Sequence, residues 1–203
     1  MKALVIVDVQ YDFLPGGALA VKDGDKIIPV INSLQPKFDL IVATQDWHPA
    51  DHGSFASNHP GKNVGDITQL GGVDQILWPV HCVQESRGAE FHADLGTSNW
   101  TKVFRKGTDK EVDSYSGFYD NNRQQDTGLA DFLKNKGVYE VVIVGLAADY
   151  CVKFTVLDAI QEGFETTLVK DATMAVNIQE GDFDKALQEM HQAGAQIILS
   201  DNL

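Results

Sequence analysis

The sequence predicts an α/β fold in which helices cover both faces of a six-stranded, mainly parallel β-sheet, a three-layer α/β/α arrangement of the Rossmann-like kind. Two observations predict it. Six short runs are rich in β-branched residues and lack polar alternation, as expected of strands that are covered on both faces. Helical patterns lie between most of these runs and the connections are short, which places consecutive strands parallel to one another.

The predicted strands and helices extend along the whole chain, so we expect a single domain formed by residues 1–203. The strands are Ala3–Val9, Leu40–Thr44, Lys102–Arg105, Val141–Val144, Thr166–Val169 and Gln196–Leu199. Apolar periodicity predicts helices over Asp25–Leu34, Gly128–Lys136, Val152–Ile160 and Asp182–Ala193. Gly137 and Gly194 follow two of these segments and mark their ends.

Residues 47–100 depart from this alternation. The segment is rich in Gly, Pro, His, Asn and Asp, and its only apolar patch is a short one at residues 73–77. It contains all three tryptophans and most of the histidines, a composition unlike that of disordered chains. Because a long irregular segment within a compact domain usually serves function, we expect this insertion to contribute to a site.

Composition restricts the classes of partner. A formal net charge of −13 argues against binding to nucleic acid or to an anionic membrane surface. Cys82 and Cys151 are the only cysteines, too few for a disulfide framework. No apolar run approaches the length of a membrane span, and the first residues lead directly into a predicted strand. We therefore expect a cytoplasmic protein; its oligomeric state stays open, a homo-oligomer included.

Cys151 lies at the junction between a buried strand, a tight turn containing Gly145, and an apolar helix. Helix N–H groups and the positive end of the helix dipole would favour the thiolate there, and the same N–H groups could hold an oxyanion. Taken alone, the position is also compatible with a cysteine that only fills space in the core.

Charged residues follow other predicted strands at the same end. Asp8 ends the first strand and Lys106 the third, and the carboxyl ends of parallel strands share one edge of the sheet, where such folds bind ligands. Asp8, Lys106 and Cys151 would therefore meet as base, electrostatic partner and nucleophile. Each also has a structural interpretation, Asp8 as a turn cap and Lys106 as a solvated loop residue.

A second group surrounds the end of the second predicted strand. Asp46 and His48 are two residues apart, so in an extended chain their side chains point the same way. His81, from the insertion, could add a third ligand. Two nitrogens and a carboxylate suit zinc, iron or manganese. His52 and Ser54 could lie around this site, whereas we expect His59, His92 and His191 to be surface or structural residues and Cys82 to be buried packing.

Five stretches, in order along nearly the whole chain, resemble the nicotinamidase (pyrazinamidase) branch of the isochorismatase-like cysteine hydrolases. They are Val5–Phe13, Thr44–Pro49, Trp78–Val83, Lys106–Gly107 with Asp113–Phe118, and Gly145–Val152. The resemblance implies the isochorismatase-like hydrolase fold with a catalytic triad of Asp8, Lys106 and Cys151. It also implies a divalent metal, most often zinc, held by Asp46, just before the 47–100 insertion, and by His48 and His81 within it.

The same resemblance implies the remaining parts of a site. Phe13, Trp78 and Tyr115 match the positions that flank the substrate ring in this family. A cis peptide before Ala147 would place the N–H groups of Ala147 and Cys151 as an oxyanion hole. Ser54 or His52 would supply a fourth metal contact.

The implied reaction is hydrolysis of nicotinamide to nicotinate and ammonia through a thioester, as in NAD salvage, with pyrazinamide as a further substrate. Two alternatives remain at this stage. One is another carboxamide or carbamoyl hydrolase of the same superfamily. The other is a non-catalytic pyridine-binding module, for which a broken triad would be the sequence signature.

Overall fold

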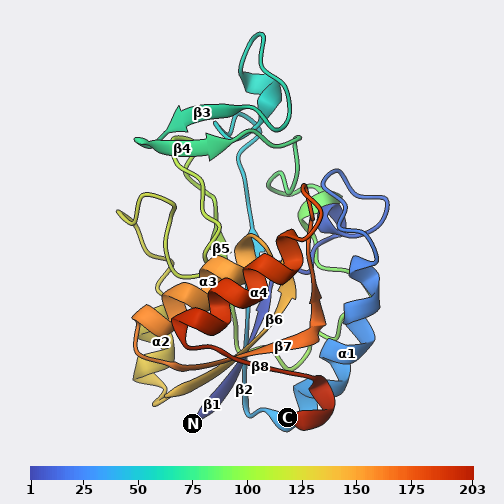
Figure 1. The fold of residues 1–203 in the computed structure, drawn as a ribbon, viewed down its shortest axis with the longest axis vertical. Coiled ribbons are helices and arrows are strands. Elements are labelled where there is room, and N and C mark those ends of the chain that lie inside the picture. Colours follow the sequence, from blue (N-terminus) through green and yellow to red (C-terminus); the bar gives the residue numbers. More distant parts are fainter.

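The computed structural model describes residues 1–203 and contains the predicted parallel sheet (Figure 1). The sheet has six strands in the order β5-β2-β1-β6-β7-β8, and every neighbouring pair is parallel. The strands are β1 (Lys2–Val7), β2 (Leu40–Asp46), β5 (Lys102–Lys106), β6 (Glu140–Leu146), β7 (Glu165–Met174) and β8 (Gln196–Ile198). All six predicted strands are confirmed, most of them one or more residues longer.

Four α-helices form the outer layers: α1 (Ile27–Leu34), α2 (Leu129–Asn135), α3 (Cys151–Gln161) and α4 (Asp182–Ala193). Helices α2, α3 and α4 cover one face of the sheet, and α1 with irregular segments covers the other (Figure 1). Alternate residues of β1 enter opposite cores, Val5 with the three-helix face and Ile6 with the α1 face. The three-layer prediction is therefore confirmed. No helix is long and apolar enough to cross a membrane.

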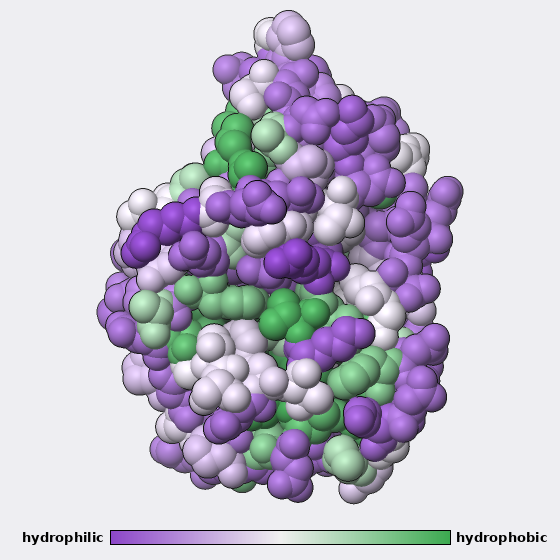
Figure 2. All heavy atoms as spheres, turned by 180° about the vertical axis from the view of Figure 1, so that it is seen from behind, coloured by the Kyte–Doolittle hydropathy of each residue, from purple (hydrophilic) through white to green (hydrophobic).

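The insertion contains an element that the sequence analysis did not predict, an antiparallel hairpin of β3 (Ile67–Leu70) and β4 (Val73–Ile76). It projects from the body of the molecule (Figure 1). Seen from behind, hydrophilic residues dominate this upper part, whereas several apolar residues reach the surface lower down (Figure 2). Few hairpin residues are buried, so its strands lack a regular apolar pattern. The one sequence feature that indicates a hairpin here is Gly71-Gly72, which forms the two-residue turn between β3 and β4 with positive φ at both residues.

The strand order locates the site. From β1 the chain continues to β2 and β5 on one side of the sheet, and it then crosses to β6, β7 and β8 on the other side, so the switch point lies between β1 and β6. In open α/β sheets this is where ligands bind, beyond the carboxyl ends of the strands. Asp8 directly follows β1, and Cys151 begins α3 after the turn that follows β6.

Candidate active site and metal centre

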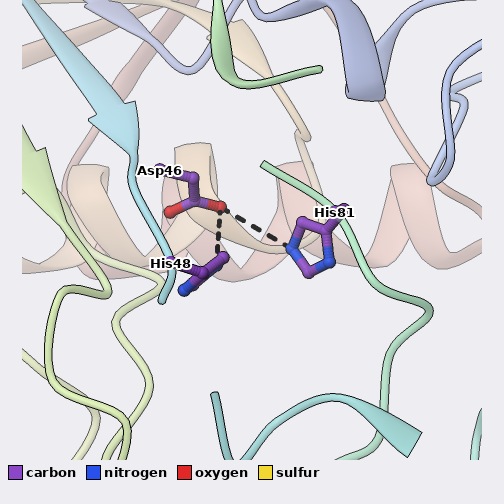
Figure 3. Close-up of side chains that lie close together, drawn as sticks. All are labelled: Asp46, His48 and His81. Carbon is purple, nitrogen blue, oxygen red and sulfur yellow. Dashed lines mark ion pairs between the residues drawn. The ribbon is translucent and has the colours of Figure 1, made fainter. Parts of the chain in front are cut away.

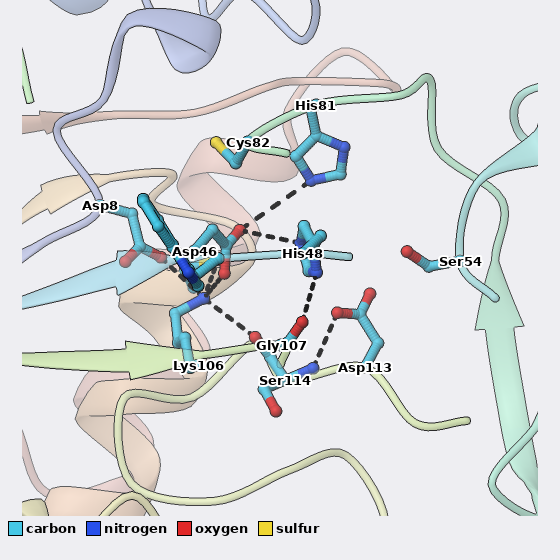
Figure 4. Close-up of polar contacts among 12 residues, drawn as sticks. Asp8, Asp46, His48, Ser54, His81, Cys82, Lys106, Gly107, Asp113 and Ser114 are labelled. Carbon is cyan, nitrogen blue, oxygen red and sulfur yellow. Dashed lines mark hydrogen bonds and ion pairs between the residues drawn. The ribbon is translucent and has the colours of Figure 1, made fainter. Parts of the chain in front are cut away.

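Lys106, the last residue of β5, lies between two carboxylates at this edge of the sheet (Figure 4). Its Nζ is 2.8 Å from Asp8 Oδ2 and forms a close ion pair with Asp46 Oδ1. It also donates to the carbonyl of Ser114 at 2.9 Å and lies 3.4 Å from Cys151 Sγ. Burial lowers the pKa of Lys106, but Asp46 and Asp8 more than offset this and hold the pKa well above its ordinary value. The ammonium is therefore charged.

Asp8 is completely buried, and its Oδ1 accepts a hydrogen bond from Thr44 Oγ1 at 2.6 Å. Burial raises the pKa of Asp8 to about 6, while the Lys106 ammonium acts in the opposite direction and Asp46 adds to the increase. A carboxylate with this pKa can take up or release a proton near neutral pH, as a general acid–base group requires.

Cys151 is the first residue of α3 and is buried beside Asp8 and Asp46; ligand atoms of the three lie within 4.8 Å of one another. The sequence analysis expected the helix end to favour the thiolate. Burial instead raises the pKa of the thiol well above its ordinary value, although Lys106 acts to lower it. At rest the group is a neutral thiol, because desolvation outweighs the nearby ammonium. A base has to remove its proton.

The turn before Cys151 leaves two donors free. The peptide bond between Leu146 and Ala147 is cis, as the family resemblance implied. The N–H groups of Ala148, Tyr150 and Val152 all donate to backbone carbonyls. Those of Ala147 and Cys151 donate to no protein atom, although both residues are buried. Two free N–H groups beside a thiol are the arrangement that an oxyanion hole needs.

Asp46, His48 and His81 form a compact buried group, with ligand atoms within 4.8 Å of one another (Figure 3). Asp46 Oδ2 lies 3.6 Å from His48 Nε2 and 3.9 Å from His81 Nε2. Burial tends to raise the pKa of Asp46, but Lys106 and the two histidines hold it below its ordinary range. This carboxylate is therefore ionised between two imidazoles.

The other ring nitrogens show that both histidines can ligate a cation. His48 Nδ1 lies 2.8 Å from the Gly107 carbonyl, and His81 Nδ1 lies 2.8 Å from the Pro79 carbonyl. Because a carbonyl only accepts, each Nδ1 carries a proton, so each Nε2, once deprotonated, offers its lone pair to a cation beside Asp46. Gly107 is required here, since a Cβ at this position would be 2.3 Å from His48 Cε1. The residues fit a divalent metal.

His52 and Ser54 lie behind this group. His52 Nδ1 is 2.7 Å from Ser54 Oγ, while His52 Nε2 is buried without a hydrogen-bond partner. His52, His48 and Asp113 form a second set whose ligand atoms lie within 4.8 Å of one another. His59, His92 and His191 take no part in either set.

A small, mostly apolar cavity opens above Cys151 and meets the metal-ligand group. Predicted site residues line it: Phe13, Asp46, Trp78, His81, Tyr115, Ala147 and Cys151. Leu19, Asp113, Tyr150 and Val176 also line it and were not predicted to be site residues. Tyr150 could have been found from its place beside the nucleophile. Nothing in the sequence marked Leu19 and Val176 as site residues. Both are ordinary apolar residues, and only the folded chain brings them to the cavity.

A sequence model of the isochorismatase domain matches residues 2–202. With its parallel sheet and the cysteine at the switch point, the chain belongs to the isochorismatase family. Within that family it is similar to the nicotinamidase of Escherichia coli K12, with 48% identity over 97% of this chain and 93% of the relative.

Solved structures give the same result. An Acinetobacter baumannii nicotinamidase/pyrazinamidase superposes with a TM-score of 0.96 at 45% identity, over 99% of this chain and 97% of that one. A pyrazinamidase of Pyrococcus horikoshii, solved in complex with zinc, superposes with a TM-score of 0.80 at 41% identity, over 98% of both chains.

Proposed function

We propose that this protein is a nicotinamidase, an amidohydrolase that converts nicotinamide to nicotinate and ammonia, and that residues 1–203 act as one domain. One observation carries the proposal: the Cys151 thiol lies between Lys106 and two free backbone N–H groups, in a cavity that also meets the histidine–carboxylate group. The identity to the E. coli nicotinamidase over almost the full chain supports the choice of reaction.

In the proposed mechanism Asp8 takes the thiol proton and Cys151 attacks the carboxamide carbon. Lys106 stabilises the thiolate, since its Nζ is 3.4 Å from the sulfur. As the C–S bond forms, the carbonyl oxygen gains negative charge, which the N–H groups of Ala147 and Cys151 stabilise. The protonated Asp8 then gives its proton to the amide nitrogen, and ammonia leaves with the electrons of the C–N bond.

A thioester on Cys151 remains. Asp8, again a carboxylate, takes a proton from water as the water oxygen attacks the thioester carbon. The C–S bond breaks, the sulfur recovers a proton through Asp8, and nicotinate is released. The buried Lys106 keeps Asp8 in place through both halves of the reaction.

Asp46, His48 and His81 would hold a divalent metal, for which we propose zinc, as in the Pyrococcus horikoshii relative. His52 and Ser54 are the two candidates for a fourth protein contact: both are buried beside His48, His52 Nε2 has no partner, and His52 Nδ1 accepts a hydrogen bond from the Ser54 N–H at 3.2 Å. When bound, the metal supplies a Lewis acid for the ring nitrogen and so orients the substrate.

The aromatic residues of the cavity fit a flat heteroaromatic substrate. The Phe13 ring is 5.5 Å from the His81 ring, and Trp78 meets Tyr150 edge-on at 4.9 Å. Phe13, Trp78 and Tyr115 would hold the ring of nicotinamide. Pyrazinamide has the same shape and a nitrogen at the equivalent ring position, so we propose it as a second substrate.

Asp46→Ala and His48→Ala test the metal site. Each removes one of three ligands, so we expect the purified variants to lose most bound metal and KM for nicotinamide to rise by about 10-fold or more. Elemental analysis and steady-state kinetics measure the two effects. His59→Ala, a histidine outside the group, is the control and should keep its metal. Unchanged metal content in both ligand variants would refute the assignment.

The pKa of Asp8 predicts the acid side of the pH profile. Asp8 has to be ionised to accept the thiol proton, and burial raises its pKa to about 6. Protonation below this pH removes the base, so kcat/KM should fall as the pH drops through about 6, by about 10-fold for each further unit. An acid limb at about pH 4, the ordinary range of aspartate, would contradict this account of Asp8.

The rival enzyme is another carboxamide or carbamoyl hydrolase of the same superfamily, and benzamide distinguishes it. Benzamide has the carboxamide and ring of nicotinamide but no ring nitrogen for a metal. We expect kcat/KM for benzamide to be lower by about 100-fold or more. Comparable rates on both amides would favour the rival. A non-catalytic pyridine-binding module is disfavoured, because Asp8, Lys106 and Cys151 are all present and in contact.

A further inference from the structure

Gln75 of the projecting hairpin is buried at the edge of the active site. Within β4 its side chain points inward with 1% exposure, while the neighbouring Asp74 is exposed. It lies against residues 113–121, a segment far from it in sequence that carries Asp113 and Tyr115 of the cavity lining. Gln75 is therefore the point at which the hairpin reaches the site.

The orientation of the Gln75 amide follows from an unambiguous donor. The backbone N–H of Tyr115 donates to Asn121 Oδ1 at 2.9 Å, so the Asn121 amide nitrogen faces away. That nitrogen donates to Gln75 Oε1 at 3.2 Å. Gln75 Nε2 then faces three acceptors, which share its two N–H groups: the Ile76 carbonyl at 2.8 Å, the Tyr115 hydroxyl at 3.0 Å and Asp113 Oδ2 at 3.1 Å. One buried amide thus joins three residues of the neighbouring segment.

Two of those residues, Tyr115 and Asp113, line the cavity. The Tyr115 hydroxyl accepts a second hydrogen bond, from Trp78 Nε1 at 3.1 Å, so Gln75 and Trp78 together fix the tyrosine ring. Asp113 is close to His48 and His52. Between them, Ser114 accepts from Lys106 through its carbonyl. A displacement of residues 113–121 would therefore move Tyr115 and Asp113, which line the cavity, more directly than the reacting sulfur of Cys151.

We propose that Gln75 is a positioning residue for substrate binding, through which the β3–β4 hairpin holds Tyr115 and Asp113 in place around the substrate ring. The proposal rests on the proposed function. Because Tyr115 contacts the ring in both ground and transition states, disturbing it removes uniform binding, which raises KM and leaves kcat largely unchanged.

The test replaces Gln75 with methionine, which keeps the length of the side chain and removes its amide. For nicotinamide we expect KM to rise by about 10-fold and kcat to change by less than about 3-fold. Gln69→Met on the exposed side of the same hairpin is the matched control, since the Gln69 side chain hydrogen-bonds only to Asp74, and it should leave both constants unchanged. An unchanged KM in Gln75→Met, or a loss confined to kcat, would overturn the proposal.

A double-mutant cycle separates positioning from general destabilisation. In a Tyr115→Phe background the hydroxyl that Gln75 holds is gone, so Gln75→Met should raise KM by less than about 3-fold. An equal factor in both backgrounds would also overturn the proposal. If Gln75→Met fails to fold, Gln75→Glu keeps the shape and the acceptor but loses the donor, and KM should rise at least as much.

Failure of the proposed function is detected separately. The wild-type enzyme is assayed first for ammonia release from nicotinamide. If it shows no turnover, the proposed reaction is rejected, and the role of Gln75 is then judged from binding alone. Calorimetric titration of nicotinamide into Cys151→Ala, with and without Gln75→Met, then measures the binding effect without chemistry. We expect the dissociation constant to rise by about the same factor as KM.

Discussion

Replacing Cys151 with alanine should lower kcat for nicotinamide by about 10⁴-fold or more, because no other nucleophile lies in the cavity beside the free N–H groups. The substitution removes one buried sulfur and leaves the aromatic residues and the metal ligands in place. Binding of nicotinamide should therefore remain measurable by calorimetry. Ammonia release under saturating substrate gives the turnover.

The second cysteine provides the control. Cys82 is buried like Cys151, but its sulfur faces the Gly88 carbonyl at 3.9 Å and it does not line the cavity. Cys82→Ser should keep turnover within a few-fold of the wild type. Near-normal rates in Cys151→Ala, or equal losses in the two variants, would be incompatible with a thioester on Cys151.

Replacing Lys106 with methionine should impair both catalysis and folding. Lys106 is 2% exposed and its ammonium is paired with Asp8 and Asp46, so its removal leaves two buried carboxylates without their cation. Breaking a buried pair in this way costs about 3–5 kcal/mol of unfolding free energy. The thiolate also loses its nearest positive charge, so we expect kcat to fall by about 10³-fold. Denaturant unfolding and steady-state kinetics measure the two effects.

Lys102, at the other end of the same strand, is the matched control. Its side chain is exposed and contacts the Phe104 ring, so Lys102→Met should change stability and rate only slightly. If Lys106→Met were as stable and as active as Lys102→Met, the ion pairs between Lys106 and the two carboxylates would have no role in the site.

Much of this site can be predicted from sequence, because parallel strands bring their carboxyl ends to one edge. Asp8, Asp46 and Lys106 each lie at the end of a strand, and buried strands with β-branched residues are easily recognised. Their closeness then follows from the strand order β5-β2-β1. Asp46 and His48 are neighbours in the sequence. To predict their group with His81, only one contact between distant segments is needed, the one that brings His81 to the end of β2.

The remaining parts depend on tertiary structure. The hairpin was missed because its short strands bury few residues, and the burial of Gln75 depends on a segment about forty residues away. The pKa of the Cys151 thiol also depends on tertiary structure. The helix position favours the thiolate, whereas burial, which only the packed structure shows, raises the pKa.

The most direct test is ammonia release from nicotinamide by the purified wild-type protein, before chelation, after chelation and after a divalent metal is restored. We expect turnover that chelation abolishes and zinc returns, because in the proposed mechanism Cys151 is the nucleophile and Asp46, His48 and His81 hold the metal that orients the ring. A folded protein that releases no ammonia with any added metal would contradict the proposed reaction. Turnover that chelation leaves unchanged, with the metal shown to be gone, would contradict the role of the metal centre.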